Sequence, residues 1–171
     1  MDIAAAKIKG LEKAMHARRD GLVGVFQTIM KQHGEASALI DRVQRTPDKC
    51  ESLWPKIKVS LLAHERSELK VVYPAMNRYR ALKRIVSQHD EEASQLEDMI
   101  ERLDAMSPES AEWMSLFGSL RDTVRSHVNE EENEFFPIAI NEMGPERVKA
   151  LDAKFKAAFN AEVVALHKTR H

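Results

Sequence analysis

The sequence predicts an all-α protein: an up-down-up-down four-helix bundle with an additional C-terminal helix and a short N-terminal helical segment. Glycine and proline together contribute only 12 of 171 residues, and most of them lie where a helical chain would turn. Apolar residues recur every three or four positions in five long stretches, and the short connections favour antiparallel neighbours. One domain over residues 1–171 is expected, with a bundle core at about 20–142 and a C-terminal helix at about 145–168.

The first half of the chain predicts one short and two long helices. An amphipathic segment at roughly residues 3–18 precedes a helix that is expected from about Gly21 to Arg45, and Thr46-Pro47-Asp48 then offers turn chemistry. The second long helix has an apolar seam over residues 53–75. It tolerates Pro55 only if this residue lies in the first turn, because an interior proline lacks the N–H that the helix needs.

The second half of the chain repeats the pattern. A third helix is expected from about Ala81 to Met106, after which Ser107 looks like an N-cap and Pro108 like the first residue of the fourth helix. Gly144-Pro145 ends the fourth helix. The fifth helix follows to about residue 167 and packs outside the bundle or against a partner.

Composition and charge exclude several classes of protein. The chain has 43% hydrophobic and 31% charged residues, and its net charge of −1 lacks the positive footprint of a dedicated nucleic-acid binder. The longest uncharged run, residues 21–30, is too short to cross a membrane. The N-terminus resembles no secretory signal, and Cys50 is the single cysteine. A cytoplasmic protein is expected, with no nucleic-acid partner and no membrane partner.

A duplicated motif carries the chemistry. His64, Glu68 and Tyr73-Pro74 have the same spacing as His127, Glu131 and Phe136-Pro137: a histidine, three residues, a glutamate, four residues, an aromatic residue and a proline. The helices that precede these motifs repeat as well, with Gln-His at residues 32–33 and 88–89. The chain therefore reads as two helical hairpins, each with one histidine on its first helix and a His–Glu pair on its second.

The repeated residues are predicted to face one core. Residues four apart share a helix face, and both His–Glu pairs continue the apolar stripes of their helices. Two carboxylates and four imidazoles would then meet in apolar surroundings, where an unpaired carboxylate is costly unless it binds a cation. The predicted metal ligands are His33, His64, Glu68, His89, His127 and Glu131.

Imidazole and carboxylate donors suit iron, manganese or zinc, and the lack of clustered thiolates disfavours structural zinc and iron–sulfur sites. Six ligands are too many for one tetrahedral zinc ion. They suit two ions, one held by His33 and His64 and the other by His89 and His127, with both glutamates spanning them. Such a site leaves room for a bridging oxo or hydroxo group and an exogenous ligand.

Other residues near these positions have simpler interpretations. Tyr73 and Phe136 are expected to be a structural wedge that closes the end of the bundle. The remaining histidines, His16, His167 and His171, lie near the chain ends and are expected to be surface residues.

These motifs resemble the hemerythrin-like (HHE cation-binding) domain over roughly residues 20–142. The resemblance implies a four-helix bundle around a non-heme di-iron centre, with the six residues as ligands and Glu68 and Glu131 as bridges. Oxygen-carrying hemerythrins have a further histidine one turn after the third-helix histidine, and this position is Ala93 here. Glu92 or water would have to fill the place.

Two other metalloprotein classes fit less well. Ferritin-like proteins carry Glu-x-x-His, but the residues three before the core histidines are Met30, Leu61, Val86 and Val124. The segment from His64 to Glu68 begins like a zinc-protease helix, but Glu68 stands where that motif has its second histidine.

The open ligand position leaves three functions. The site binds O2 reversibly or stores iron; or it is an enzyme that turns over peroxide or nitric oxide, as relatives of this ligand type are associated with; or it is an iron- or oxygen-sensing regulatory module. In the last case the fifth helix would repack or dock a partner, and a homodimer through this helix is possible. The expectation is a hemerythrin-like di-iron protein with a diatomic or peroxide ligand, and whether it is an enzyme stays open.

Overall fold

The computed structural model describes residues 2–168, which are helical almost throughout and contain no strand, so the all-α prediction is confirmed. Short 3-10 turns lie at Pro47–Lys49 and Arg80–Leu82, and π-helical turns lie at Glu68–Val72 and Glu131–Phe135. The α-helices are α1 (Asp2–Arg19), α2 (Val25–Arg45), α3 (Cys50–Ser67), α4 (Tyr73–Met76), α5 (Lys83–Asp104), α6 (Ala111–Glu130), α7 (Phe136–Met143) and α8 (Pro145–Lys168).

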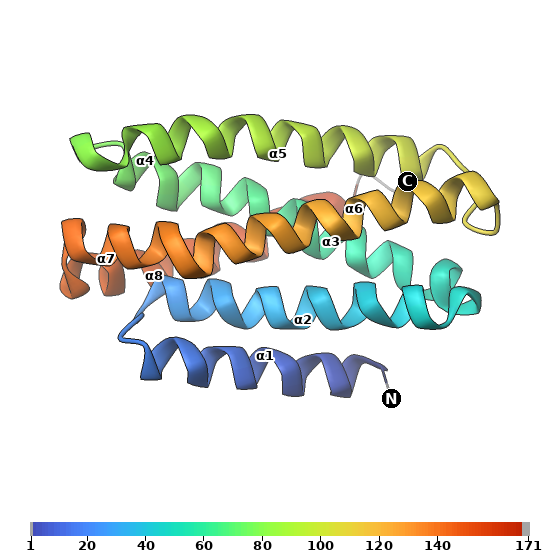
Figure 1. Ribbon diagram of the computed structural model, residues 1–171, viewed down its shortest axis with the longest axis horizontal. Helices are drawn as coiled ribbons and strands as arrows, with labels where there is room; N and C mark the ends of the chain where they lie inside the picture. Colours follow the sequence, from blue (N-terminus) through green and yellow to red (C-terminus); the bar gives the residue numbers. More distant parts are fainter. Residues whose placement is uncertain (1, 169–171) are drawn as a thin grey trace.

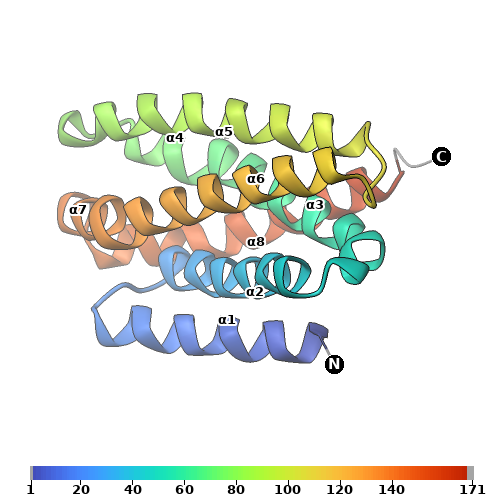
Figure 2. The same ribbon diagram turned by 45° about the vertical axis from the view of Figure 1, so that its right-hand side comes forward.

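The long helices lie side by side along one direction (Figure 1). Helix α2 packs against α3 and α6, and α5 packs against the same two helices. Helix α1 lies along the outer side of α2, and α8 packs against α3 and α2, as the turned view also shows (Figure 2). The predicted C-terminal helix is therefore present, and it covers part of the helical bundle.

The apolar core is divided into two clusters. One cluster contains Trp54, Trp113 and Phe117, and the other contains Phe26, Phe135 and Phe155. Along α2 the second cluster comes first and the first follows, whereas along α3 and its continuation into α4 the order is reversed, as expected for antiparallel neighbours. On each of these helices the predicted metal-binding residues fall between the two clusters. Packing therefore sandwiches one polar layer between two apolar ones.

Three details of the predicted helices are wrong. Helix α2 begins at Val25, because Gly24 has a φ of 58°, which no helix accommodates. Pro55 lies inside α3 beyond its first turn, since the helix already begins at Cys50. The N-cap of α6 is Ser110, whose hydroxyl accepts a hydrogen bond from the Trp113 N–H, and Ser107 lies in the preceding turn.

The duplicated motif produces a duplicated π-helical turn. Each turn begins at the glutamate of the motif, and its closing bond runs from the aromatic N–H to the carbonyl five residues back: Tyr73 to Glu68 and Phe136 to Glu131. The following proline has no N–H to continue an α-helical ladder, and the wider turn accommodates this break. The apolar periodicity predicts unbroken helices here, whereas each motif in fact contains a π-helical turn.

Helix α1 approaches α2 closely through two glycines. A Cβ atom added to Gly34 would lie 2.6 Å from the Lys9 carbonyl oxygen and 2.9 Å from the Gly10 Cα. A Cβ on Gly10 would lie 2.7 Å from the Lys31 carbonyl oxygen. Larger side chains would force the helices apart. The glycine contact therefore places α1 near enough for its side chains to reach the region of the polar layer.

Candidate metal centre

The structure brings the six predicted residues into one buried layer. His33 comes from α2, His64 from α3, His89 from α5 and His127 from α6, while Glu68 and Glu131 begin the two π-helical turns. None of the six is more than 8% exposed. By contrast, His16 and His167 are exposed as expected, and His171 lies outside the described residues.

The first group of possible ligands consists of His33, His64, Glu68 and Glu131, whose candidate donor atoms all lie within 4.8 Å of one another. The Nε2 atoms of His33 and His64 are 3.2 Å apart, so both imidazoles point to the same place. His33 Nε2 is 3.2 Å from Glu131 Oε2, and His64 Nε2 is 3.5 Å from Glu68 Oε2. Two nitrogens and two carboxylates therefore converge here.

The second group consists of Glu65, Glu68, His89 and His127, whose donor atoms also lie within 4.8 Å of one another. His127 Nε2 is 3.4 Å from Glu65 Oε1 and 3.4 Å from Glu131 Oε2. His89 Nε2 is 3.6 Å from Glu65 Oε2 and 3.9 Å from Glu68 Oε2. Glu68 belongs to both groups, and Glu131 touches a histidine of each, so both glutamates span the two places.

Glu65 is a further candidate ligand, which is absent from the six residues predicted from the sequence. It is only 2% exposed and lies beside both histidines of the second group. Its position three residues before Glu68 and four after Leu61 continues the buried stripe of the helix, and this spacing was the available signal. The pairing of Glu65 with one particular group depends on how α3 is rotated toward α5 and α6.

The donor atoms fit a cation because many have no other partner. Among the described residues, eight buried side-chain nitrogen or oxygen atoms lack a hydrogen-bond partner, and seven of them belong to this layer. Buried polar groups are nearly always satisfied, and a buried ionised group without a partner costs several kcal/mol. The seven atoms are Oε2 of Glu65, both carboxylate oxygens of Glu68, both ring nitrogens of His89, Nε2 of His127 and Oε2 of Glu131.

Three of the imidazoles are oriented by outer hydrogen bonds. The Nδ1 atoms of His33, His64 and His127 lie 2.9 Å from Glu132 Oε1, 2.8 Å from Gln32 Oε1 and 3.1 Å from Glu92 Oε2. A proton on each Nδ1 is donated to the oxygen, which leaves Nε2 free to bind a cation. Lys13 of α1 holds Glu132 in turn.

Ala93 leaves one ligand missing beside His89, and the acidic residue that lies nearest to this histidine is Glu65 and not the expected Glu92. Glu92 accepts a hydrogen bond from the outer nitrogen of His127, so its carboxylate lies behind that ring and does not enter the layer. The Glu65 carboxylate lies on the inner side, next to His89 and His127. An acidic residue from α3 therefore adds a carboxylate to the group of donor atoms that, by the resemblance, lacks one protein ligand.

Tyr73 and Phe136 differ in their roles although they occupy the same place in the motif. The Tyr73 hydroxyl donates a hydrogen bond of 2.5 Å to Glu131 Oε1, and its ring stacks on His89 with centroids 3.6 Å apart. Phe136 stacks on Phe26. The wedge interpretation is therefore wrong for Tyr73, which contacts two site residues directly, and it stays a prediction for Phe136, whose ring also lies parallel to that of His33 with centroids 6.3 Å apart.

Burial and mutual repulsion keep protons on part of the site. Burial, with the neighbouring carboxylates of Glu131 and Glu65, raises the pKa of Glu68 well above its usual value. Burial also raises the pKa of Glu65 to about 7. Burial opposes the charged form of His127, but Glu131 and Glu65 outweigh it and raise the pKa of this imidazole to about 10. Without a cation the layer therefore keeps itself near neutrality by binding protons.

The thermal stability of the metal-free protein should fall as the pH rises from 7 to 9. The folded-state pKa values of Glu65 and His127 are raised, to about 7 and about 10, so their stabilisation is present at low pH and is lost as the pH passes these values. Thermal denaturation in chelator at pH 6, 7, 8 and 9 measures the trend. A melting temperature that rises over this range would contradict the assignment.

Glu92→Ala should weaken one cation site by about ten- to hundredfold, because His127 loses the partner that orients it. Gln32→Ala is the matched variant, since Gln32 supports His64 of the other group. Calorimetric titration of the metal-free variants with Mn²⁺ resolves the two sites. If both variants weakened the same site, or neither weakened any, the division into two groups would be wrong.

A pocket gives access to the layer. Its volume is about 330 Å³, and His33, His64, Glu65 and His127 are among the residues that line it. The volume is roughly ten times that which a water molecule occupies in the liquid. A small molecule can therefore reach donor atoms of both groups from this side.

The fold and this layer define a helical protein with a buried site for metal cations. The Hemerythrin HHE cation binding domain matches residues 24–139, which is more than half of the chain, and the chain belongs to this family.

A comparison with curated proteins gives one relative: the chain is 26% identical over 138 residues to a DNA nickase from Nostoc sp. (strain PCC 7120 / SAG 25.82 / UTEX 2576). The match covers 80% of this chain and 39% of the nickase, so the chain spans well under half the length of that relative. No solved structure matches the chain significantly. Among the described helices, none combines the length and the apolar character that crossing a membrane requires.

Proposed function

We propose that the chain is a non-heme di-iron protein that binds a small oxidant. One iron would be held by His33, His64, Glu68 and Glu131. The other would be held by His89, His127, Glu65 and Glu68, with Glu131 completing the bridge. The observation that carries this proposal is the set of unpartnered donor atoms in two groups that share Glu68.

The arrangement of the helices around the cations is part of the same proposal. Helices α2, α3, α5 and α6, with the π-helical turns and the short helices that follow, would be the up-down-up-down four-helix bundle of the hemerythrin type. The packing of α2 and α5 against both α3 and α6 supports it. The side-chain oxygens of Glu132, Gln32 and Glu92, which lie next to the Nδ1 atoms of three of the histidines, would hold these imidazoles in place.

Iron held in this site would supply reversible binding, or reduction and oxidation, of O2, peroxide or nitric oxide. The protein's own part is to admit and orient such a ligand. The pocket lets it reach His33, His64, Glu65 and His127, and the two apolar clusters exclude bulk water from the layer on either side. The Tyr73 hydroxyl holds its proton beside Glu131, and burial with the Glu131 charge raises the pKa of this phenol well above its usual value.

Elemental analysis of the aerobically purified chain tests the proposal, with His64→Ala plus His127→Ala as the matched variant. About two irons per wild-type chain, lost in the variant, are expected. Two equivalents of another metal would support a site for two cations and contradict its assignment to iron. No transition metal, even after anaerobic loading with Fe²⁺, would show that the layer is only a polar network.

Exposure of the ferrous protein to each oxidant separates the candidate functions. An O2 adduct that leaves under vacuum indicates a carrier. Oxygen evolution from peroxide without added reductant indicates a catalase-like enzyme, and consumption of nitric oxide indicates an NO-handling enzyme. A sensor would instead change conformation with iron state, which hydrogen exchange of α8 would detect. The pocket, which lets a small molecule reach the donor atoms, favours the carrier and the two enzymes over the sensor.

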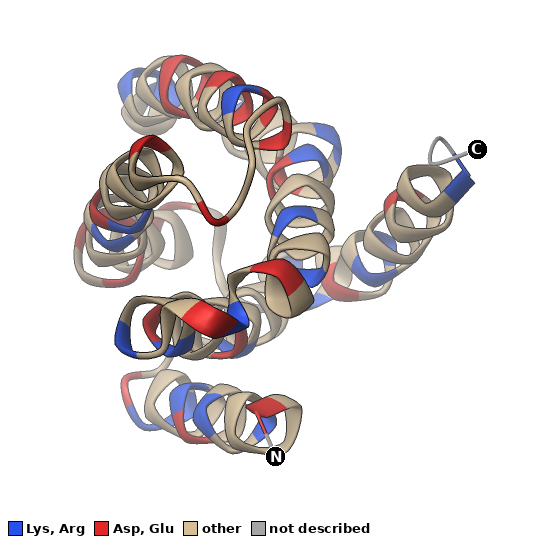
Figure 3. Ribbon diagram, turned by 90° about the vertical axis from the view of Figure 1, so that its right-hand side faces the viewer, with Lys and Arg blue, Asp and Glu red and all other residues tan. Residues whose placement is uncertain are grey.

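DNA is not proposed as a partner of this chain. DNA is named by the Nostoc relative, but we propose no DNA binding or cleavage for this chain, because its net charge is −1 and both signs of charge are interspersed on its helices (Figure 3). Supercoiled plasmid should stay intact in a nicking assay. A cytoplasmic location and a homodimer through α8 stay predictions, and analytical ultracentrifugation tests the dimer.

A further inference from the structure

The pocket beside the metal layer is much larger than a diatomic or peroxide ligand needs. At about 330 Å³ it falls within the range of pockets that bind organic molecules. Its walls come from six helices, α1, α2, α3, α5, α6 and α8, and the lining includes exposed side chains such as Lys7, Lys56 and Gln95. The pocket therefore joins the buried layer to solvent.

One part of the pocket lining is apolar, beside the polar part that residues of the metal layer form. The lining here consists of buried members of one core cluster, to which Phe159 of α8 is added. A hydrocarbon chain placed against these side chains would leave water, which is the main source of affinity in such pockets. The buried aliphatic members are Leu39, Leu61, Leu96, Val124 and Val128.

The charged side chains of the lining differ in whether they have partners. Among the lining carboxylates, Glu35 binds Lys31 at 2.8 Å, Glu92 accepts from His127, and Glu130 accepts from the neutral amide of Gln88 at 2.8 Å. Glu65 belongs to the metal layer and keeps one oxygen without a hydrogen-bond partner. In contrast, no described carboxylate lies within 4 Å of the ammonium group of Lys7 or Lys56. Lys7 and Lys56 are therefore the lining cations that remain available to pair with a ligand.

We propose that this pocket binds an apolar organic anion, a carboxylate carried on a hydrocarbon chain. The carboxylate pairs with Lys7 of α1 and Lys56 of α3, and the chain lies against the apolar wall toward the metal layer. The proposal goes beyond metal binding and does not require the cations, because both recognition elements belong to the protein.

Calorimetric titration with octanoate, and with octan-1-ol as the neutral analogue, tests this in both the purified and the metal-free full chain. Saturable 1:1 binding of octanoate is expected in both forms, with weaker binding of the alcohol. Lys7→Gln plus Lys56→Gln should lower the affinity for octanoate about fivefold, the effect of two exposed ion pairs, and added salt should weaken wild-type binding. Ala36→Phe should abolish binding by filling the pocket.

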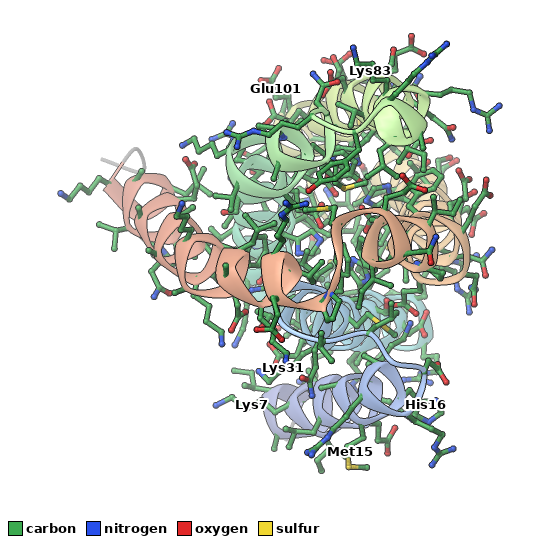
Figure 4. The ribbon with its side chains drawn as sticks, turned by 90° about the vertical axis from the view of Figure 1, so that its left-hand side faces the viewer. Lys7, Met15, His16, Lys31, Lys83 and Glu101 are labelled. Atoms are coloured by element: carbon green, nitrogen blue, oxygen red, sulfur yellow. The ribbon has the colours of Figure 1, made fainter. Side chains whose placement is uncertain are left out.

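The matched control is Lys83→Gln plus Lys154→Gln, which removes the same charge outside the pocket and should leave the affinity unchanged; Lys83 and Lys7 lie on opposite sides of the molecule (Figure 4). Equal affinity for the alcohol, no saturable binding, or an unchanged affinity in the double lysine variant overturns the proposal. So does binding only when metal is present, which would place the carboxylate on the metal. If Ala36→Phe fails to fold, Ser60→Phe replaces it. Metal content, measured on the same samples, reports on the di-iron proposal independently.

Discussion

Glu68→Met should abolish the binding of both cations, whereas His33→Ala and Glu65→Gln should each leave one. Glu68 is the residue common to both groups of donor atoms, while His33 belongs only to the first and Glu65 only to the second. Methionine is close to glutamate in size and offers no oxygen, so the change removes a ligand without opening a large cavity. We expect about two cations per chain in the wild type, about one in His33→Ala, about one in Glu65→Gln and none in Glu68→Met.

Metal analysis after loading with Fe²⁺ and desalting measures these values. Glu134→Met provides the matched control, because this glutamate lies on the same π-helical turn as Glu131 but is exposed and should retain both cations. Loss of a single equivalent from Glu68→Met would show that the two cations are held independently. Full retention in Glu65→Gln would return the second site to the six-ligand set of the resemblance.

The same Glu68→Met variant should be more stable than the wild type when both are metal-free. The two oxygens of Glu68 have no hydrogen-bond partner, the residue is fully buried, and burial with the neighbouring carboxylates raises its pKa well above the usual value. Replacement of buried ion pairs by apolar side chains of similar volume is often neutral or stabilising by about 1–4 kcal/mol. The same is expected here because His64 and His89, which lie beside Glu68, have lowered pKa values and leave no unpaired charge behind. For a chain of this length, each kcal/mol corresponds to roughly 2–4 °C in melting temperature.

With cations bound, the wild type should instead melt at a higher temperature than Glu68→Met. Cations that bind only the folded state stabilise the wild type by mass action and leave the variant unchanged. Thermal denaturation of both proteins, in chelator and then with excess Mn²⁺, gives the four melting temperatures. A metal-free variant that melts well below the metal-free wild type would mean that Glu68 is satisfied by groups of the protein, and the site would then be a structural network.

These two predictions share one physical cause. A layer of carboxylates and imidazoles between two apolar clusters is unfavourable by itself, and its cost is removed when cations occupy it. The raised pKa values of Glu65, Glu68 and His127 describe the same effect with protons in place of metal ions. Metal affinity is therefore expected to increase from pH 6 to pH 8, since binding must displace these protons.

The sequence by itself determined the fold class and predicted the six candidate ligands that the structure brings into one layer. Helical periodicity is local, and residues four apart share a face in any α-helix, so His64 with Glu68 and His127 with Glu131 were predictable without knowing the packing. The duplication supplied the rest, because two similar hairpins place His33 and His89 in related positions. Nothing in this inference needed the distance between helices.

Only the tertiary structure decided which residues meet across helices. The assignment of Glu65 to the second group, the support of His33 by Glu132 and the bond from Tyr73 to Glu131 depend on the rotation and relative height of neighbouring helices. The Pro55 position and the pocket under α1 depend on where helices begin and how closely they pack. Spacing along one helix is set by its hydrogen bonds, whereas the register between helices is set by side-chain packing over the whole core.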